Sequence, residues 1–117
     1  MTDYAELNRG LWAGSDGTRL QRARFALESI GRGKRVLEVG CAKGEIGSLL
    51  GPGNRLIGLD VVREYVWNLG SGYENAVIAN AVCLPFRAGG FDAVFAGEFI
   101  EHLKESDGRR FLWDAHR

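Results

Sequence analysis

The stretch K-R-V-L-E-V-G-C-A-K-G at residues 34–44 constrains the fold of this chain more than any other. Its first part, Arg35 to Val39, is short, apolar and rich in β-branched residues, which is typical of a buried parallel strand. A loop of small residues follows from Gly40, and residues 45–50 predict the start of a helix. Glycines let a ligand approach the backbone, and a helix N-terminus offers free N–H groups. The stretch therefore predicts a ligand site between a strand and a helix.

The rest of the chain alternates predicted strands with predicted helices. Further strands are expected at residues 55–59, 76–79 and 91–96, and helices at 18–30, 62–69 and 107–117. Such alternation predicts right-handed βαβ units and a parallel sheet that binds its ligand at the carboxyl ends of the strands. The second strand ends on Asp60, where a ribose-binding carboxylate belongs in folds of this kind.

Two of the predicted helices are amphipathic, and this predicts the faces that pack on the sheet. The apolar stripes are Leu20, Ala23, Leu27 and Ile30 in the first helix, and Phe111, Leu112 and Ala115 in the last. Gly31 is expected to end the first helix.

Composition bounds the class of protein. The chain has 117 residues, enough for one domain, and 45% of them are hydrophobic. Its 15 basic and 15 acidic residues balance, which argues against general nucleic-acid binding. The two cysteines, Cys41 and Cys83, form no disulfide framework and are expected to pack as small apolar residues. Because neither a signal peptide nor a transmembrane run is visible, we expect no membrane partner and a cytoplasmic location.

Four motifs appear in a fixed order between residues 34 and 103: E-V-G-C-A-K-G, L-I-G-L-D, N-A-V-C-L-P-F and F-D-A-V-F-A-G-E-F-I-E-H-L. In this order and spacing the chain resembles the class I S-adenosylmethionine-dependent methyltransferases, in particular the methyltransferase type 11-like domains. The glycine loop departs from the dinucleotide fingerprint G-x-G-x-x-G, since Ala42 stands where the middle glycine would be. The L-P-F and E-H-L segments are likewise not expected in nicotinamide dehydrogenases.

The resemblance implies S-adenosylmethionine as cofactor and S-adenosylhomocysteine as product. The cofactor-binding residues that it implies are Glu38, Gly40, Cys41, Ala42, Gly44, Asp60, Val61, Asn80 and Ala81. The loop from Gly40 to Gly44 would approach the methionyl part, although turn geometry alone also explains its glycines. Glu38 would orient this loop or hold the cofactor's ammonium group through water, and a purely bracing role is the alternative.

The remaining implied residues would bind the nucleoside. Asp60 would accept hydrogen bonds from both ribose hydroxyls, with a plain helix N-cap as the alternative. Val61 would pack on the adenine, and the Ala81 N–H would face the ring. Asn80 stands where the family usually has aspartate, and its side-chain carbonyl would accept from the adenine amino group.

The segment E-x-x-E-H at residues 98–102 is the catalytic candidate. The resemblance places it where the methyl acceptor would lie, with His102 as general base and Glu98 beside it. A divalent metal held by Glu98, Glu101 and His102 is a weaker alternative, and a structural role for all three is another.

We therefore expect an α/β fold: a Rossmann-like parallel sheet of order 3-2-1-4 with flanking helices, incomplete beyond its fourth strand. Residues 1–33 would form an N-terminal helical segment and residues 34–117 the cofactor-binding domain. The open edge of the fourth strand suggests the N-terminal half of a larger domain, or a homodimer formed through that edge.

The expected function is methyl transfer to an O, N or C atom of a small-molecule acceptor. The alternatives are a cofactor-binding half-domain without catalysis of its own, and a nicotinamide-binding oxidoreductase.

Overall fold

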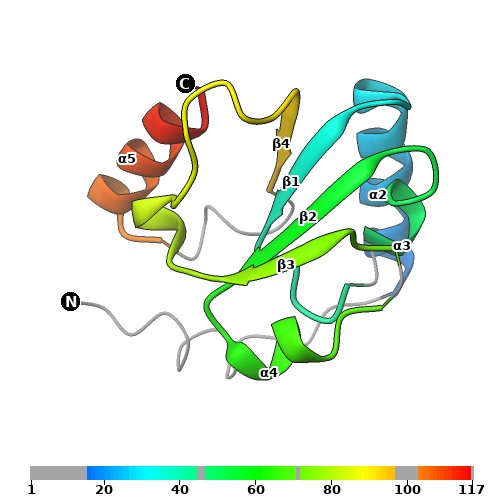
Figure 1. The fold of residues 1–117 in the computed structure, drawn as a ribbon, viewed down its shortest axis with the longest axis horizontal. Helices are drawn as coiled ribbons and strands as arrows, with labels where there is room; N and C mark the ends of the chain where they lie inside the picture. The colour runs from blue at the N-terminus through cyan, green and yellow to red at the C-terminus, as the bar shows by residue number, and fades with distance from the viewer. Residues whose placement is uncertain (1–15, 45–46, 71, 97–102, 117) are drawn as a thin grey trace.

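In the computed structural model, residues 16–44, 47–70, 72–96 and 103–116 are described, and they form a parallel sheet with helices on both faces (Figure 1). The strands are β1 (Arg35–Val39), β2 (Arg55–Asp60), β3 (Asn75–Ile78) and β4 (Ala93–Phe95). Their order in the sheet is β3-β2-β1-β4, and every neighbouring pair is parallel. The predicted fold class and strand order are confirmed.

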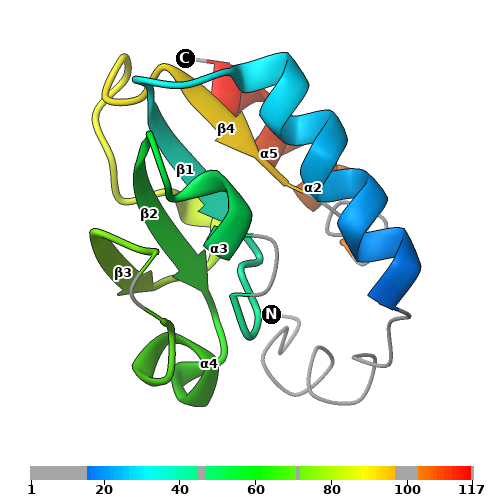
Figure 2. The ribbon, with the colours of Figure 1, turned by 90° about the vertical axis from the view of Figure 1, so that its right-hand side faces the viewer.

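The helices divide between the two faces of the sheet (Figures 1 and 2). They are α2 (Asp16–Ile30), α3 (Gly47–Leu50), α4 (Arg63–Trp67), the 3-10 helix η1 (Ala81–Cys83) and α5 (Glu105–His116). Helices α2 and α3 cover one face, η1 and α5 cover the other, and α4 follows the carboxyl end of β2. Among the helices of the described ranges, none is both long and apolar enough to cross a membrane.

The core lies on both sides of β1, because a central parallel strand is buried on both faces. Leu37 and Val39 point to the α5 face, where Leu59, Ala81 and Phe111 complete a buried cluster. Val36 points to the opposite face, in a second cluster whose other buried members are Ala26, Leu50 and Leu56. Burial of each such large side chain contributes about 1.5–3 kcal/mol of transfer free energy.

The helical phase of the two amphipathic helices differs in detail from the prediction. Ala26, which the predicted stripe of α2 omitted, is 2% exposed, and its neighbour Phe25 is 70% exposed. In α5 Phe111 is buried as predicted, but the prediction for Leu112 is wrong, since it is 56% exposed. Adjacent residues in a helix point about 100° apart, so the two members of each of these pairs cannot both face the sheet directly. Gly31 follows α2 with φ of 81°, which is the expected helix stop.

Strand β4 is shorter than predicted, and the residues just before it contact β1 and the 84–91 segment. The Asp92 carboxylate accepts a hydrogen bond from the Arg35 N–H at 2.8 Å, and the Asp92 N–H donates to the Arg35 carbonyl at 2.8 Å. Phe91 packs edge-on against Phe86, with ring centroids 5.0 Å apart. These contacts fix the start of β4 beside the start of β1.

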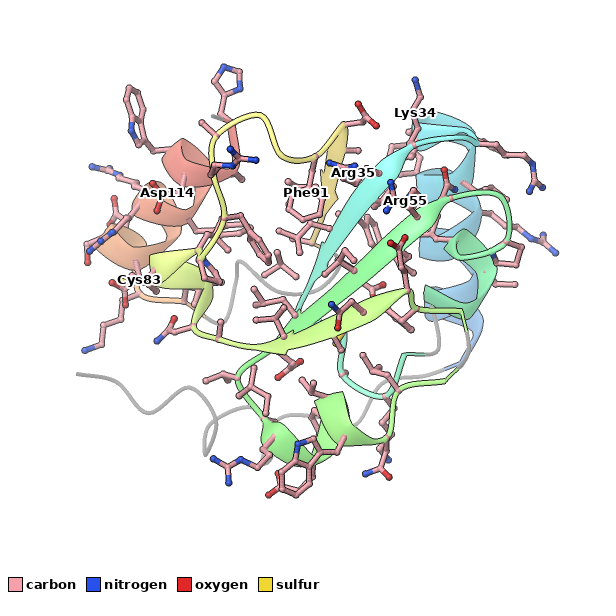
Figure 3. All side chains as sticks on the ribbon, in the orientation of Figure 1. Lys34, Arg35, Arg55, Cys83, Phe91 and Asp114 are labelled. Carbon is pink, nitrogen blue, oxygen red and sulfur yellow. The ribbon has the colours of Figure 1, made fainter. Side chains whose placement is uncertain are left out.

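Basic side chains gather where the strands begin, at the end of the sheet away from the glycine loop; Lys34, Arg35 and Arg55 are labelled in Figure 3. The Arg35 guanidinium donates to the Gly90 carbonyl at 3.2 Å. Arg55 donates twice to the Glu74 carboxylate, at 2.9 and 2.7 Å. These groups tie the strand starts to neighbouring turns.

Candidate functional site

The glycine loop turns sharply after β1 and then runs toward β2. Gly40, Ala42 and Gly44 all have positive φ, of 73°, 48° and 79°. Glycine adopts this conformation without a steric penalty, whereas an alanine there costs about 1–2 kcal/mol. The Gly40 and Cys41 N–H groups both donate to the Leu59 carbonyl, at 2.8 and 3.1 Å. The Gly44 N–H donates to the Cys41 carbonyl at 2.9 Å.

Asp60 lies at the carboxyl end of β2 and joins this loop to the next segment. Its side chain is buried, and one carboxylate oxygen accepts from the Ala42 N–H at 2.9 Å. The other oxygen accepts from the Val62 N–H at 2.9 Å. The N-cap of α4 is Val62, without a side-chain cap, so the alternative that Asp60 is the N-cap of α4 is wrong. Together with the Val61 amide, these donors use three of the four lone pairs of the carboxylate, and the remaining one can accept from a ribose hydroxyl.

Glu38 is a second buried carboxylate, placed just before the loop and only 3% exposed. The Tyr73 hydroxyl donates a hydrogen bond to it. The pKa of Glu38 is raised to about 7, chiefly by burial; the Tyr73 hydrogen bond opposes this rise, and the nearby Asp60 charge adds to it. Burial also raises the pKa of Asp60, against hydrogen bonds from three backbone amides.

The electrostatic character of the site follows from these partners. The amides of Gly40, Cys41, Ala42 and Gly44 already have acceptors within the protein, so they are not available to cradle a phosphate. Two buried carboxylates lie close to the loop. This arrangement favours a ligand that carries positive charge, and it disfavours the pyrophosphate of a dinucleotide.

Cys41 is buried within the loop, as its prediction as a packing residue requires. Burial raises the pKa of its thiol, and the charges of Asp60 and Glu38 raise it further. The thiol therefore stays protonated at neutral pH, which disfavours a nucleophilic role. Cys83, in contrast, is exposed on η1, so its prediction as a buried packing residue is wrong (Figure 3).

The residues expected to bind adenine follow β2 and β3. Val61 comes directly after Asp60 and is partly buried. The Asn80 side-chain oxygen accepts from the Val82 N–H at 3.0 Å and thereby caps η1. The expected contact of this oxygen with an adenine amino group would use its second lone pair. Ala81 is 5% exposed and packs in the core with Leu37.

The structure brings the predicted cofactor residues together at the carboxyl ends of β1, β2 and β3. Glu38 and Gly58 are paired in the sheet, and the hydrogen bond from Ala42 to Asp60 closes the site between the two strands. The catalytic and metal candidates, Glu98, Glu101 and His102, lie outside the described residues.

Sequence reasoning missed Tyr73. It stands 35 residues from Glu38, in a turn whose glycines signalled only the end of a helix. The available signal was the glycines at 44, 47 and 58, in three separate elements: a large side chain must fill the space that their missing Cβ atoms leave.

A hollow on the face of the sheet that α5 covers is not part of this site. It lies between α5, the 84–91 segment and β1, and its lining includes Phe91 and Asp114, both labelled in Figure 3. None of the nine predicted cofactor residues lines it.

Comparison with known proteins agrees with this architecture. The family described as "Methyltransferase domain" matches residues 37–117. An O-methyltransferase, rstn1 of Aspergillus nomiae, is 30% identical over an alignment 84 residues long that covers 63% of this chain and 37% of that protein.

Two solved structures have the same fold. A TehB-like SAM-dependent methyltransferase from Corynebacterium glutamicum has a TM-score of 0.70 and 27% identity, over 98% of this chain and 64% of that one. The N-methyltransferase NodS from Bradyrhizobium japonicum, in complex with S-adenosyl-L-homocysteine, has a TM-score of 0.71 and 23% identity, over 84% of this chain and 53% of that one. The chain thus spans between about a third and two thirds of the length of these relatives. With the family match over most of its length and this arrangement of loop and carboxylates, the chain belongs to the methyltransferase domain family.

Proposed function

We propose that this chain binds S-adenosylmethionine and serves methyl transfer from it to a small-molecule acceptor. One observation carries the proposal: the amides of Gly40, Cys41, Ala42 and Gly44 are bonded within the protein, while two buried carboxylates lie beside the loop. S-adenosylmethionine has a sulfonium, an ammonium group and a ribose diol, and it has no phosphate. Its chemistry therefore fits this donor and acceptor set better than a dinucleotide does.

Each part of the cofactor has a proposed partner. Glu38 would attract the ammonium group, directly or through water, because an ionised acceptor strengthens such a hydrogen bond. Asp60 would accept from the ribose hydroxyls while its amide bonds hold it in place. Val61, Asn80 and Ala81 would surround the adenine. The names of the Aspergillus and Bradyrhizobium relatives, an O-methyltransferase and an N-methyltransferase, support transfer to a heteroatom without deciding which one.

The reaction asks the protein mainly for alignment. The bound sulfonium supplies its own activation, since it carries a methyl group with a neutral thioether leaving group. The chain's residues would hold the donor so that the acceptor lone pair approaches in line with the methyl–sulfur bond, and would exclude water. His102 is proposed to take a proton from the acceptor, with Glu98 beside it; a metal bound by these two and Glu101 is the weaker alternative.

The partners and location predicted from the sequence remain proposals as well. The outer edge of β4 pairs with no strand among the described residues, so association of two copies through this edge is a further proposal. The expected absence of membrane and general nucleic-acid partners, and a cytoplasmic location, rest on composition alone.

Two alternatives are separated by simple observations. A half-domain that binds the cofactor but does not catalyse would bind S-adenosylhomocysteine and methylate no acceptor. An oxidoreductase would prefer a nicotinamide dinucleotide, which the occupied loop amides argue against.

The test is calorimetric titration of the chain with S-adenosylhomocysteine and, separately, with NAD. We expect saturable binding of the first ligand only. Asp60→Asn removes the negative charge of the acceptor proposed for the ribose hydroxyls, and we expect a loss of about 2 kcal/mol of binding free energy, roughly 30-fold in affinity.

The matched control is Asp92→Asn, which also loses a carboxylate bonded to a backbone N–H but lies at the opposite end of the sheet. Its affinity should equal that of the wild type. Tight NAD binding, or an unchanged affinity in Asp60→Asn, would refute the proposal.

A further inference from the structure

Tyr73 reaches across the sheet to the acid beneath the glycine loop. It precedes β3, packs against the cluster on the α2 face, and sends its hydroxyl to the Glu38 carboxylate on β1. The strand between them, β2, has Gly58 at the position that pairs with Glu38. A Cβ at Gly58 would lie 3.0 Å from the Tyr73 ring, so glycine lets the ring cross β2 without being displaced.

Two further glycines accommodate the same side chain. A Cβ at Gly47, the first residue of α3, would lie 1.8 Å from the Tyr73 oxygen, and one at Gly44 would lie 3.0 Å from the ring. The Gly47 amide also donates to the Tyr73 oxygen. The tyrosine hydroxyl thus joins Glu38 of β1 to the start of α3, on either side of the loop.

We propose that Tyr73 is a positioning residue of the cofactor site, whose hydroxyl holds the Glu38 carboxylate in place to receive the ligand's ammonium group. This inference rests on the proposed function. Tyr73 would act through Glu38 and the loop, without touching the cofactor itself.

The titratable groups around Glu38 determine how the positioning role of Tyr73 would affect the pH dependence of ligand binding. The titratable groups that face it are Tyr73, Asp60 of β2 and Cys41 of the loop. Burial and the Glu38 charge raise the pKa of Tyr73, so it stays a phenol and a donor at neutral pH. The Tyr73 hydrogen bond favours the ionised form of Glu38, whereas burial and the Asp60 charge oppose it. Removal of the hydroxyl should therefore shift ionisation of Glu38, and ammonium binding with it, to higher pH.

The experiment measures the affinity for S-adenosylhomocysteine between pH 5.5 and 8.5 in wild type and Tyr73→Phe. Phenylalanine keeps the ring over Gly58 and removes only the hydroxyl. A lost hydrogen bond to an ionised group corresponds to about one pKa unit or more. We expect the variant to bind roughly tenfold more weakly at pH 5.5 and roughly fivefold more weakly at pH 7, with the ratio to wild type shrinking further toward pH 8.5. A ratio that stays constant across this range indicates a merely structural role and overturns the inference.

Glu38→Gln supplies the second arm. If Tyr73 acts through Glu38, adding Tyr73→Phe to Glu38→Gln should change affinity far less than adding it to wild type. An equal loss in both backgrounds contradicts the inference. If wild-type protein does not bind S-adenosylhomocysteine, the proposed function itself is overturned. If it binds but the ratio of wild-type to Tyr73→Phe affinity does not change with pH, only the role of Tyr73 is overturned.

A measurement on wild-type protein covers the case in which Tyr73→Phe does not fold. The Glu38 carboxyl carbon is followed by NMR against pH, together with the Tyr73 hydroxyl proton. The two signals should share one midpoint, and S-adenosylhomocysteine should lower it. Separate midpoints, or a shared midpoint that the ligand leaves unchanged, would refute the role.

Discussion

Glu38 should make the stability of this protein fall as pH rises through the neutral range. Its pKa is raised from 4.5 to about 7 in the folded state, chiefly by burial. Between these two values the folded chain keeps a proton that the unfolded chain has released. The unfolded state then binds fewer protons, so the free energy of unfolding decreases with pH. The contribution is most favourable below about pH 4.5 and is lost as pH rises to about 7.

The size of the effect follows from the shift. One pKa unit corresponds to about 1.4 kcal/mol, so a shift from 4.5 to about 7 corresponds to about 3 kcal/mol. Glu38→Gln removes the titrating group and keeps an oxygen that can accept from the Tyr73 hydroxyl. From pH 4.5 to pH 8 the free energy of unfolding of the variant should therefore rise by about 3 kcal/mol relative to that of wild type. This change with pH does not depend on how the two proteins differ in stability at pH 4.5.

The assay is urea unfolding followed by tryptophan fluorescence at pH steps from 4.5 to 8. The comparison of variant with wild type cancels most of the contribution of other groups, including Asp60. Glu105→Gln, in the exposed first turn of α5, is the control and should give a curve parallel to wild type. Parallel curves for wild type and Glu38→Gln would refute the reasoning, because they would mean that Glu38 is ionised in the folded state already near pH 5.

Two further predictions concern packing, and each has a matched control. Gly58→Ala should destabilise the fold by about 1–3 kcal/mol, because its Cβ would lie 2.8 Å from the nearest side chain. Gly108→Ala is the control: outside the backbone of α5 itself, no atom lies within 4 Å of the added Cβ, so this change should be neutral or slightly stabilising. Thermal unfolding of the two variants decides this, and equal losses would contradict it. Phe111→Ala should cost about 3–5 kcal/mol in urea unfolding, since the side chain is 2% exposed, whereas Trp113→Ala, at 71% exposed, should cost far less. Similar losses for both would show that α5 does not pack on the sheet as described.

The parts of the fold that were predictable are those that local sequence specifies. The run from Val36 to Val39 is too apolar for an edge strand, and the glycines after it end the strand. Strand order followed from the family resemblance and the alternation of elements. The position of Asp60 at a strand end also follows from the chain itself, because parallel strands present their carboxyl ends on one edge.

The remainder depended on contacts between distant segments. Tyr73 was not predictable as the partner of Glu38, because nothing in a linear sequence states which large side chain fills the space above a glycine. The faces of α2 and α5 were uncertain for a related reason. Ala26 in α2 and Leu112 in α5 each lie about 100° around the helix from a neighbour that also fits the apolar stripe. Only packing against the sheet decides which residue of each pair is buried.

The order of the sheet has a consequence for how such a protein can diversify. Every described residue proposed to contact the donor lies between Glu38 and Ala81: on β1, on β2, in the turns after β1, β2 and β3, or at the start of η1. Strand β4 and α5 contribute none of them. A lineage could therefore replace its acceptor specificity through changes after β4 while the donor half stays constant. In such a division one cofactor site could serve many substrates.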